Sequence, residues 1–299
     1  MSSYHETVLL RESVEALAIQ DNETYVDVTF GGGGHSSLIL RNLKTGRLVA
    51  FDQDEDAKSN LLQDEKLIFV PHNFKYLKRF LKYHNQIPVS GVLADLGISS
   101  YQIDAGEKGF STRFEGPMDM RMNQDADLTA EQILLTYSEV DLVRIFSEYG
   151  EVRNSKTLAK AIVGARQNGI GFSSTKSFVG FLKNYIMGKE NRYLAQVFQA
   201  LRIEVNDELG VLKSMLEQSL DVLKVGGRLA IITFHSLEDR LVKNFLKTGN
   251  FEGKMKQDDF GRALTPFKLV NKKPIEASEE ELKVNPRSRS AKLRIAEKL

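Results

Sequence analysis

The sequence predicts an α/β fold: a Rossmann-like, doubly wound parallel sheet interrupted by a block of helices. Short β-rich runs alternate with helical patterns over about the first 100 residues, which is typical of βαβ units around a buried parallel sheet. Helical patterns alone fill residues 103–193, and a further buried strand follows at 228–234. We therefore expect one domain formed by residues 1–102 and 194–299, with a helical domain inserted between them.

Four strands with helices between them are expected before the insertion. Each strand is a short apolar run, and the four runs are Thr24–Thr29, Arg47–Asp52, Leu67–Val70 and Gly91–Asp95. Apolar residues recur near helical spacing in the intervening segments 35–43, 54–63 and 74–84. In an open sheet of this kind, ligands bind beyond the carboxyl ends of the strands, so functional residues are sought there.

The insertion and the chain after it carry clear helix signals. Thr129 and Gln132 form a capping-box pattern, and Ser138 is suited to cap the helix that follows it. The apolar stripe at 178–186 is expected to lie in a helical core. Residues 207–224 form an amphipathic helix pattern that leads into the last predicted strand.

Composition excludes several classes of protein. The chain has 299 residues, of which 41% are hydrophobic and 27% are charged, as expected for a globular protein with a substantial core. Its lack of cysteine excludes disulfides, thiolate metal sites and cysteine nucleophiles, and the histidines show no metal-ligand spacing. The net charge of +1 argues neither for nor against binding of nucleic acid, and any basic surface must be local. Neither a signal peptide nor a membrane span is expected, so the predicted location is cytoplasmic.

A glycine-rich turn is the strongest local signal. The run from Asp27 to His35 contains four consecutive glycines and lies between the first strand and the first helix. Consecutive glycines allow the backbone to approach a ligand closely and to adopt positive φ angles. The turn is therefore a candidate ligand-binding loop.

The residues around the turn narrow the choice of ligand. The dinucleotide fingerprint lacks its third glycine because Ser36 stands there, and no phosphate-binding P-loop follows. Asp52 ends the second strand, where a carboxylate can bind the ribose hydroxyls of either NAD or S-adenosylmethionine. The acidic Asp27 favours S-adenosylmethionine, because a carboxylate would repel a pyrophosphate. Phe74 is placed either to stack on adenine or to anchor its own helix.

A polar motif, Asp95-Leu-Gly-Ile-Ser-Ser100, ends the fourth strand and faces the same crevice. Methyltransferases that act on amino groups place such a motif here. The nitrogen of a nucleobase amine is a poor nucleophile, since its lone pair is delocalised into the ring. An acceptor that takes a hydrogen bond from the amine restores part of that lone pair and orients the nitrogen.

At this point a family resemblance becomes specific. The sequence closely resembles the RsmH (MraW) family, which methylates N4 of a cytosine in the decoding region of bacterial 16S ribosomal RNA with S-adenosylmethionine. The motifs that carry the resemblance span almost the whole chain in order: His5-Glu-Thr-Val-Leu-Leu, Thr29-Phe-Gly-Gly-Gly-Gly-His-Ser36, Asp95-Leu-Gly-Ile-Ser-Ser100, Gly116-Pro-Met-Asp-Met-Arg-Met122, Phe234-His-Ser-Leu-Glu-Asp-Arg240 and Asn285-Pro-Arg-Ser-Arg-Ser-Ala291.

The resemblance implies a class I methyltransferase sheet and a set of cofactor contacts. It assigns cofactor contact to Gly33, Gly34, His35, Asp52, Phe74, Asp95 and Gln102. To these roles we add the hypothesis that Asp95 also activates the target amine. The absence of cysteine agrees with N4 methylation, since C5 methylation of cytosine normally needs a thiolate nucleophile.

Other residues are candidates for contact with the RNA. His235 is a candidate proton acceptor near the base, or a structural histidine at a strand end. Arg240 is placed either to contact phosphate or to pair with Glu238 or Asp239, and Arg121 is a candidate site residue in the insertion. The basic tail around Arg287, Arg289 and Arg294 suits phosphate contacts, or else forms a solvated or edge-strand segment.

The predicted function is therefore methylation of 16S ribosomal RNA, with the small ribosomal subunit as the expected partner and without a metal. Two other classes stay open on the sequence. One is an RNA-binding ribosome-assembly factor without catalytic activity. The other is an NAD-dependent oxidoreductase, which the missing third glycine disfavours.

Overall fold

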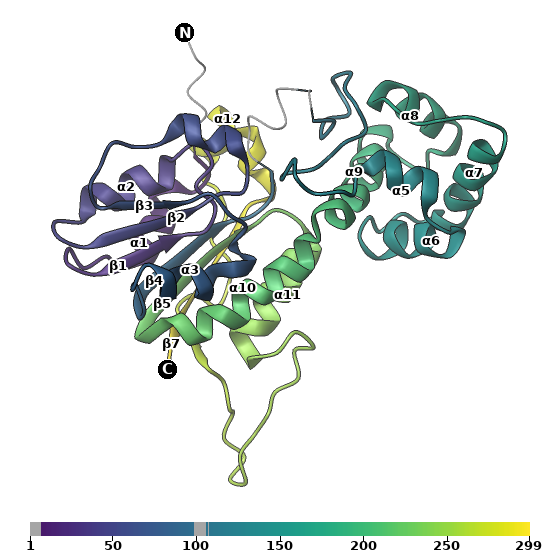
Figure 1. Cartoon of the computed structure of the whole chain (residues 1–299). Coiled ribbons are helices and arrows are strands. Elements are labelled where there is room, and N and C mark those ends of the chain that lie inside the picture. The colour runs from purple at the N-terminus through teal and green to yellow at the C-terminus, as the bar shows by residue number, and fades with distance from the viewer. Residues whose placement is uncertain (1–6, 99–105, 107) are drawn as a thin grey trace. The chain divides into compact units, whose positions relative to one another are not determined.

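The structure is a computed structural model that describes residues 7–98, 106 and 108–299. The chain divides into two compact units (Figure 1). The sheet unit comprises Met1–Gly97 and Leu209–Leu299, and the helical unit comprises Ile98–Glu208. The second boundary lies later than position 193, because helix α9 (Glu190–Asn206) buries its apolar residues in the helical core.

The sheet unit contains seven strands in the order β3-β2-β1-β4-β5-β7-β6 among the described residues. Their bounds are β1 Thr24–Asp27, β2 Arg47–Phe51, β3 Leu67–Val70, β4 Val89–Asp95, β5 Leu223–Thr233, β6 Phe267–Leu269 and β7 Lys292–Lys298. Strands β1 to β5 are parallel, and β7 is antiparallel to both β5 and β6. Strands β2 and β3 lie on one side of β1, and β4 and β5 lie on the other. A ligand crevice is expected where the strand order reverses, beyond the carboxyl ends of β1 and β4.

Two apolar cores cover the faces of the sheet, because alternate residues of each strand point to opposite faces. Val92 lies in one core, while its neighbour Leu93 lies in the other. Helices α3 (Leu77–Tyr83), α10 (Glu208–Val222) and α11 (Ser236–Thr248) pack on the Val92 face. Helices α1 (Leu10–Ala16) and α2 (Gly34–Asn42) pack on the Leu93 face.

Part of the basic C-terminal segment, Lys292–Lys298, forms strand β7 of the sheet. Leu293 and Ile295 alternate with polar residues in β7 and are buried. Arg294 forms a two-pronged ion pair with Asp239, at 2.6 and 3.0 Å. Of the two alternatives for the tail, Arg294 fits the strand segment, because its guanidinium is held by a carboxylate of α11.

Short helical segments connect the strands at the carboxyl edge. Residues 54–63 form only a 3₁₀ turn, η1 (Glu55–Asn60), where a longer helix was expected. The others are η2 (Phe74–Tyr76), α12 (Glu279–Val284) and η4 (Pro286–Ser290). Within the described ranges, the helices lack the combination of length and apolar character that crossing a bilayer requires.

The helical unit is built from α5 (Ala130–Thr136), α6 (Glu139–Glu148), α7 (Ser155–Gln167), α8 (Thr175–Leu182), the 3₁₀ turn η3 (Lys183–Tyr185) and α9. The predicted capping box is confirmed, since Thr129 and Gln132 satisfy each other's backbone N–H groups. Ser138 caps α6 as predicted. Met118 and Met120 are buried in the core of this unit, so they serve packing.

Candidate active site

The glycine turn joins β1 to α2 at the carboxyl edge of the sheet. Gly31 and Gly33 have positive φ angles of 50° and 75°, which other residues rarely adopt. A Cβ atom at Gly34 would lie 1.9 Å from Oγ1 of Thr7, so a side chain does not fit there. At Gly32 a Cβ atom would meet nothing within 4 Å among the described residues, which leaves this part of the turn open to a ligand.

Asp52 connects the turn to the end of β2. Its Oδ2 accepts a hydrogen bond from the Gly31 N–H at 2.7 Å, and its Oδ1 accepts one from Asp54 N–H at 2.9 Å. Burial raises the pKa of Asp52 to about 6, although these two N–H groups act to lower it. Each carboxylate oxygen keeps a further lone pair that can accept a hydrogen bond from a hydroxyl group.

Asp27 has a different role from the one the sequence suggested. Its carboxylate is fully buried, and it accepts hydrogen bonds from the Ser36 hydroxyl at 2.7 Å and the Thr29 N–H at 3.0 Å. Asp27 therefore fixes the two ends of the glycine turn and does not present its oxygens to a ligand. The sequence analysis did not single out Thr29 or Ser36 for this role; their signal was two hydroxyl residues flanking the four glycines.

Asp95, at the end of β4, is held through its backbone rather than its side chain. Its N–H donates to the Thr29 hydroxyl at 2.7 Å. Its side chain is 24% exposed, and its Oδ1 has no hydrogen-bond partner among the described residues. Burial, together with the negative charges of Asp27, Glu238 and Glu281, raises the pKa of Asp95 well above its usual range. Among the described residues, Oδ1 of Asp95 is thus left free to accept a hydrogen bond.

His35 lies beside Asp95 at the start of α2. Its Nδ1 is 3.9 Å from Oδ2 of Asp95, and the ring is buried. Burial lowers the pKa of His35 to about 4, although a hydrogen bond with the Val8 backbone opposes this shift. The ring is therefore neutral at pH 7, and its Nε2 has no partner in the part of the chain that the structure describes.

Phe74 begins η2, directly after β3, and is partly buried against the sheet core. The preceding Asn73 accepts a hydrogen bond from Lys75 N–H at 2.8 Å and donates one to the Gln53 side chain at 2.7 Å. These bonds tie the end of β3 to the end of β2, so Phe74 lies on the same edge of the sheet as Asp52. Gln102, the remaining predicted cofactor contact, lies outside the described residues.

His235 caps α11 after β5. Its Nδ1 accepts from the Glu238 N–H at 3.5 Å, and its Nε2 lies 3.2 Å from Oε1 of the same residue. Glu238 also accepts from the Phe234 N–H at 3.0 Å. These contacts give His235 a structural part in starting α11. Its proposed part in proton transfer stays a prediction.

The predicted RNA-binding arginines lie in different surroundings. Arg240 is exposed, and its neighbour Asp239 is engaged by Arg294. Arg287 and Arg289 lie on η4; Arg289 is exposed and Arg287 is partly buried. The RNA contacts of these arginines stay predictions.

Arg121, in the helical unit, is occupied by its own loop. Its guanidinium donates two hydrogen bonds to Asp119, both at 2.8 Å. It donates two more to the carbonyl oxygens of Gln124 at 2.9 Å and Ala126 at 2.7 Å. Four of its five N–H groups are thereby used, and its local role is to hold this loop closed.

Comparison with known proteins identifies the family. A family model described as the MraW methylase family matches residues 2–299. Proteins named "Ribosomal RNA small subunit methyltransferase H" are similar over almost their whole length. The one from Bacteroides thetaiotaomicron is 55% identical over 99% of this chain and 98% of its own. The one from Amoebophilus asiaticus is 54% identical over 99% and 96%. The one from Flavobacterium johnsoniae is 52% identical over 99% and 98%. This chain belongs to the MraW methylase family.

Proposed function

We propose that this protein uses S-adenosylmethionine to methylate small-subunit (16S) ribosomal RNA, at the N4 amino group of a cytosine in the decoding region. Membership of a methylase family and the names of the relatives support a ribosomal RNA methyltransferase. The observation that carries the chemistry is the carboxylate oxygen of Asp95 that has no hydrogen-bond partner in residues 7–98, 106 and 108–299, at the same sheet edge as an open glycine turn. The reaction places the protein in the cytoplasm, with the ribosomal RNA.

The residues at this edge fit S-adenosylmethionine better than NAD. Asp27, Asp52 and Asp95 gather negative charge at the carboxyl ends of β1, β2 and β4, and that charge contributes to the raised pKa values of Asp52 and Asp95. A sulfonium and an ammonium group are attracted to such a surface, whereas a pyrophosphate is repelled. The open face at Gly32 gives the amino-acid end of the cofactor access to backbone N–H groups.

Residues of the chain hold the cofactor, which supplies an electrophilic methyl carbon on sulfur. Asp52 accepts hydrogen bonds from the ribose hydroxyls, since its oxygens retain free lone pairs. Phe74 packs beside the adenine, and Gly33 and Gly34 bring the backbone close to the amino-acid end. Neutral His35 lines the site without adding a positive charge that would oppose the cationic cofactor.

Asp95 activates the acceptor. Its free Oδ1 accepts a hydrogen bond from the exocyclic N–H, which orients the amine and increases electron density on nitrogen. Transfer of the methyl group to nitrogen would break its bond to sulfur and leave S-adenosylhomocysteine, while nitrogen would gain a positive charge and have one proton to lose. Asp95 in its ionised form takes that proton through Oδ1, the oxygen without a hydrogen-bond partner among the described residues.

The test is transfer of a labelled methyl group from S-adenosylmethionine to ribosomal RNA, followed by mass analysis of nuclease fragments. The proposal predicts one additional methyl group on a single cytosine, at N4. Ribosomal RNA from cells that lack the protein should miss that group and regain it when the wild-type gene is restored. A methyl group at another atom, or at another nucleotide, would refute the assignment of the acceptor. RNA binding without transfer would favour an assembly factor.

A further inference from the structure

A long hairpin, residues 250–266, projects from the sheet unit between α11 and β6; we call it the finger (Figure 1). Its base is fixed to the core. The Phe251 ring stacks on Phe245 with 5.1 Å between centroids, and the Asn244 side chain donates to the Phe251 carbonyl at 2.9 Å. A Cβ atom at Gly249 would lie 2.7 Å from Cδ of Pro266, so the two ends of the finger meet closely.

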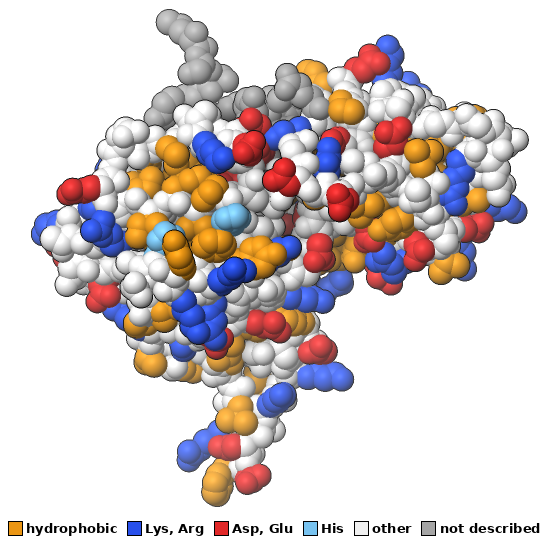
Figure 2. Space-filling view, in the orientation of Figure 1, with side chains coloured by type: hydrophobic (Ala, Val, Ile, Leu, Met, Phe, Trp, Pro, Cys, Tyr) orange, Lys and Arg blue, Asp and Glu red, His pale blue; other side chains and the backbone are white. Residues whose placement is uncertain are grey.

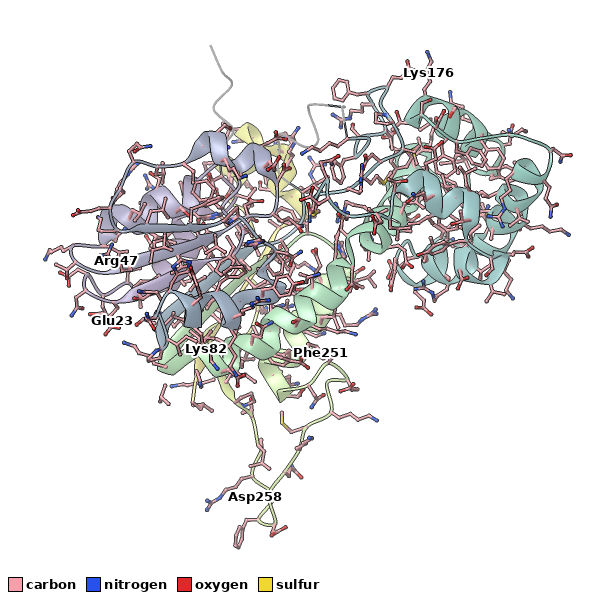
Figure 3. All side chains as sticks on the ribbon, viewed as in Figure 1. Glu23, Arg47, Lys82, Lys176, Phe251 and Asp258 are labelled. Carbon is pink, nitrogen blue, oxygen red and sulfur yellow. The ribbon has the colours of Figure 1, made fainter. Side chains whose placement is uncertain are left out.

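The tip of the finger is an ordered turn, although it lies far from the base (Figure 3 labels Phe251 at the base and Asp258 at the tip). The Leu264 N–H donates to the Lys256 carbonyl at 2.8 Å, which pairs the two arms. Oδ1 of Asp258 accepts from the N–H groups of Phe260 and Arg262, at 2.9 and 2.8 Å. These bonds join residues of the finger to one another, so the hairpin keeps its shape without support from the core.

The finger carries exposed apolar groups, three basic residues (Lys254, Lys256 and Arg262) and three acidic residues (Glu252, Asp258 and Asp259). Phe260 is 85% exposed, and Leu264 and Met255 are 54% and 41% exposed. The Arg262 guanidinium lies over the Phe260 ring, 6.0 Å from its centroid, and Lys254 and Lys256 stand on one arm. Figure 2 shows apolar, basic and acidic side chains along this projection. An exposed aromatic ring among cationic side chains is the combination that stacks on a base and binds the flanking phosphates.

Helix α11 extends this basic surface. Arg240, Lys243 and Lys247 are exposed and follow helical spacing, so they lie on one face. None of them forms an ion pair with a described residue, while Asp239 of the same helix is engaged by Arg294. The stretch from Arg240 to Lys268 contains seven Lys and Arg residues and three acids, in a chain whose net charge is only +1. The excess of basic charge lies on α11 and at Lys268, because the three basic residues of the finger are balanced by three acidic ones.

The topology separates the finger from the active site. Helix α11 begins after the carboxyl end of β5 and leads through the finger into β6. Since β7 is antiparallel to both β5 and β6, β5 and β6 run in the same direction, and α11 returns the chain to the amino edge of the sheet. A helix of 13 residues spans about 20 Å. Only a large ligand can reach the active site and the finger together.

We propose that the finger and the exposed face of α11 form a second RNA-contact surface, which engages folded ribosomal RNA outside the segment that enters the active site. This inference rests on the proposed function and adds to it a second contact surface for the same ribosomal RNA. Phe260 stacks on an unpaired base, and the basic residues of α11 and the finger bind phosphates.

The first experiment replaces residues 256–263 with Gly-Gly, which shortens the finger above its anchored base. Methylation is measured on isolated small ribosomal subunits and on a short RNA hairpin that carries the target cytosine. We expect kcat/KM on the subunit to fall by about tenfold or more, because the variant loses one stacked base. Activity on the short hairpin should stay unchanged. Equal activity of variant and wild type on both substrates, or an equal loss on both, would overturn the inference. Inactivity of the wild-type protein on both substrates would instead overturn the proposed function.

Charge and partner are tested separately. The K254Q/K256Q variant should bind protein-free small-subunit RNA with a log–log salt slope smaller by about 1.5, since each phosphate contact contributes about 0.7–0.9. The matched control, K44Q/K58Q, removes two exposed lysines that pair with Asp21 and Glu55 and should keep the wild-type slope. A photocrosslinker at position 260 should label RNA in the small subunit. Labelling of a ribosomal protein alone, or equal slopes for the two variants, would overturn the RNA assignment.

Discussion

The carboxyl edge of the sheet and the Arg121 loop of the helical unit differ in how far their carboxylates are paired. In the loop, Asp119 receives two hydrogen bonds from the Arg121 guanidinium and one from its N–H. Burial acts to raise the pKa of Asp119, but these contacts outweigh it and the pKa is lowered. At the edge, Asp95 has no cationic partner among the described residues at comparable distance, and burial raises its pKa.

This difference separates a structural motif from a functional one. In the Arg121 loop the charged groups of Arg121 and Asp119 are hydrogen-bonded to each other, which stabilises the loop. Few of their donors and acceptors remain to bind a ligand. The sheet edge keeps a buried carboxylate incompletely satisfied, which costs stability but leaves it able to bind a cation or take a proton. Both motifs were equally conspicuous in the sequence, and only the surroundings of each carboxylate show which one carries chemistry.

The largest effect should come from Asp95→Asn. The amide keeps the shape of the side chain but cannot take a proton, so the methyl-transfer rate should fall by about 10²–10⁴-fold. Single-turnover transfer to ribosomal RNA measures the rate, and calorimetry with S-adenosylmethionine measures cofactor affinity. A variant that retains near wild-type transfer would show that the unused oxygen has no part in the reaction.

Substitution of Arg121 should lower the stability of the protein rather than its catalytic activity. Arg121→Ala removes four side-chain hydrogen bonds and leaves partly buried Asp119 without its partner, so the free energy of unfolding should fall by about 2–4 kcal/mol. Urea denaturation measures the loss. Cofactor affinity of the folded protein should be unchanged; a specific drop in RNA affinity with normal stability would instead assign Arg121 to the substrate.

Asp52 should give a smaller effect with a pH signature. Asp52→Ala should weaken S-adenosylmethionine binding by about 1–3 kcal/mol, through loss of the ribose contacts. Because the folded-state pKa is raised to about 6, the carboxylate is ionised above that pH and protonated below it. Wild-type affinity should therefore decrease as the pH falls from 7 to 5, by at most about tenfold per unit below 6. Calorimetry across this range should show a flatter profile for the variant, and identical profiles would count against a ribose contact.

Two neighbouring glycines provide the finest comparison. Gly34→Ala places a Cβ atom 1.9 Å from Oγ1 of Thr7, so thermal unfolding should reveal a loss of about 1–2 kcal/mol. Gly32→Ala meets no described atom within 4 Å, so its stability should be unchanged while cofactor affinity falls. If Gly32→Ala bound S-adenosylmethionine normally, the open face of the turn would not be the cofactor surface.

The sequence predicted the parallel strands well because each is a compact apolar run between polar turns. Leu67–Val70 has the predicted bounds, and β1, β2 and β4 differ from prediction by one or two residues at an end. Strand β7 was missed as a central element. Its alternation of Leu293 and Ile295 with charged residues resembles an edge strand or a basic tail until β6 is known to pair with it.

The sequence by itself determined the sheet, the helical insertion, the glycine turn and the position of Asp52 and Asp95 at strand ends, since these follow from local periodicity and the geometry of parallel strands. Only the tertiary structure decided which charged groups are satisfied. Asp27 is enclosed by Ser36 and Thr29, Arg121 is closed onto its loop, and Asp95 has an oxygen without a partner in the described part of the chain. The pKa of a carboxylate depends on burial and on partners brought from distant parts of the chain, which no local pattern records.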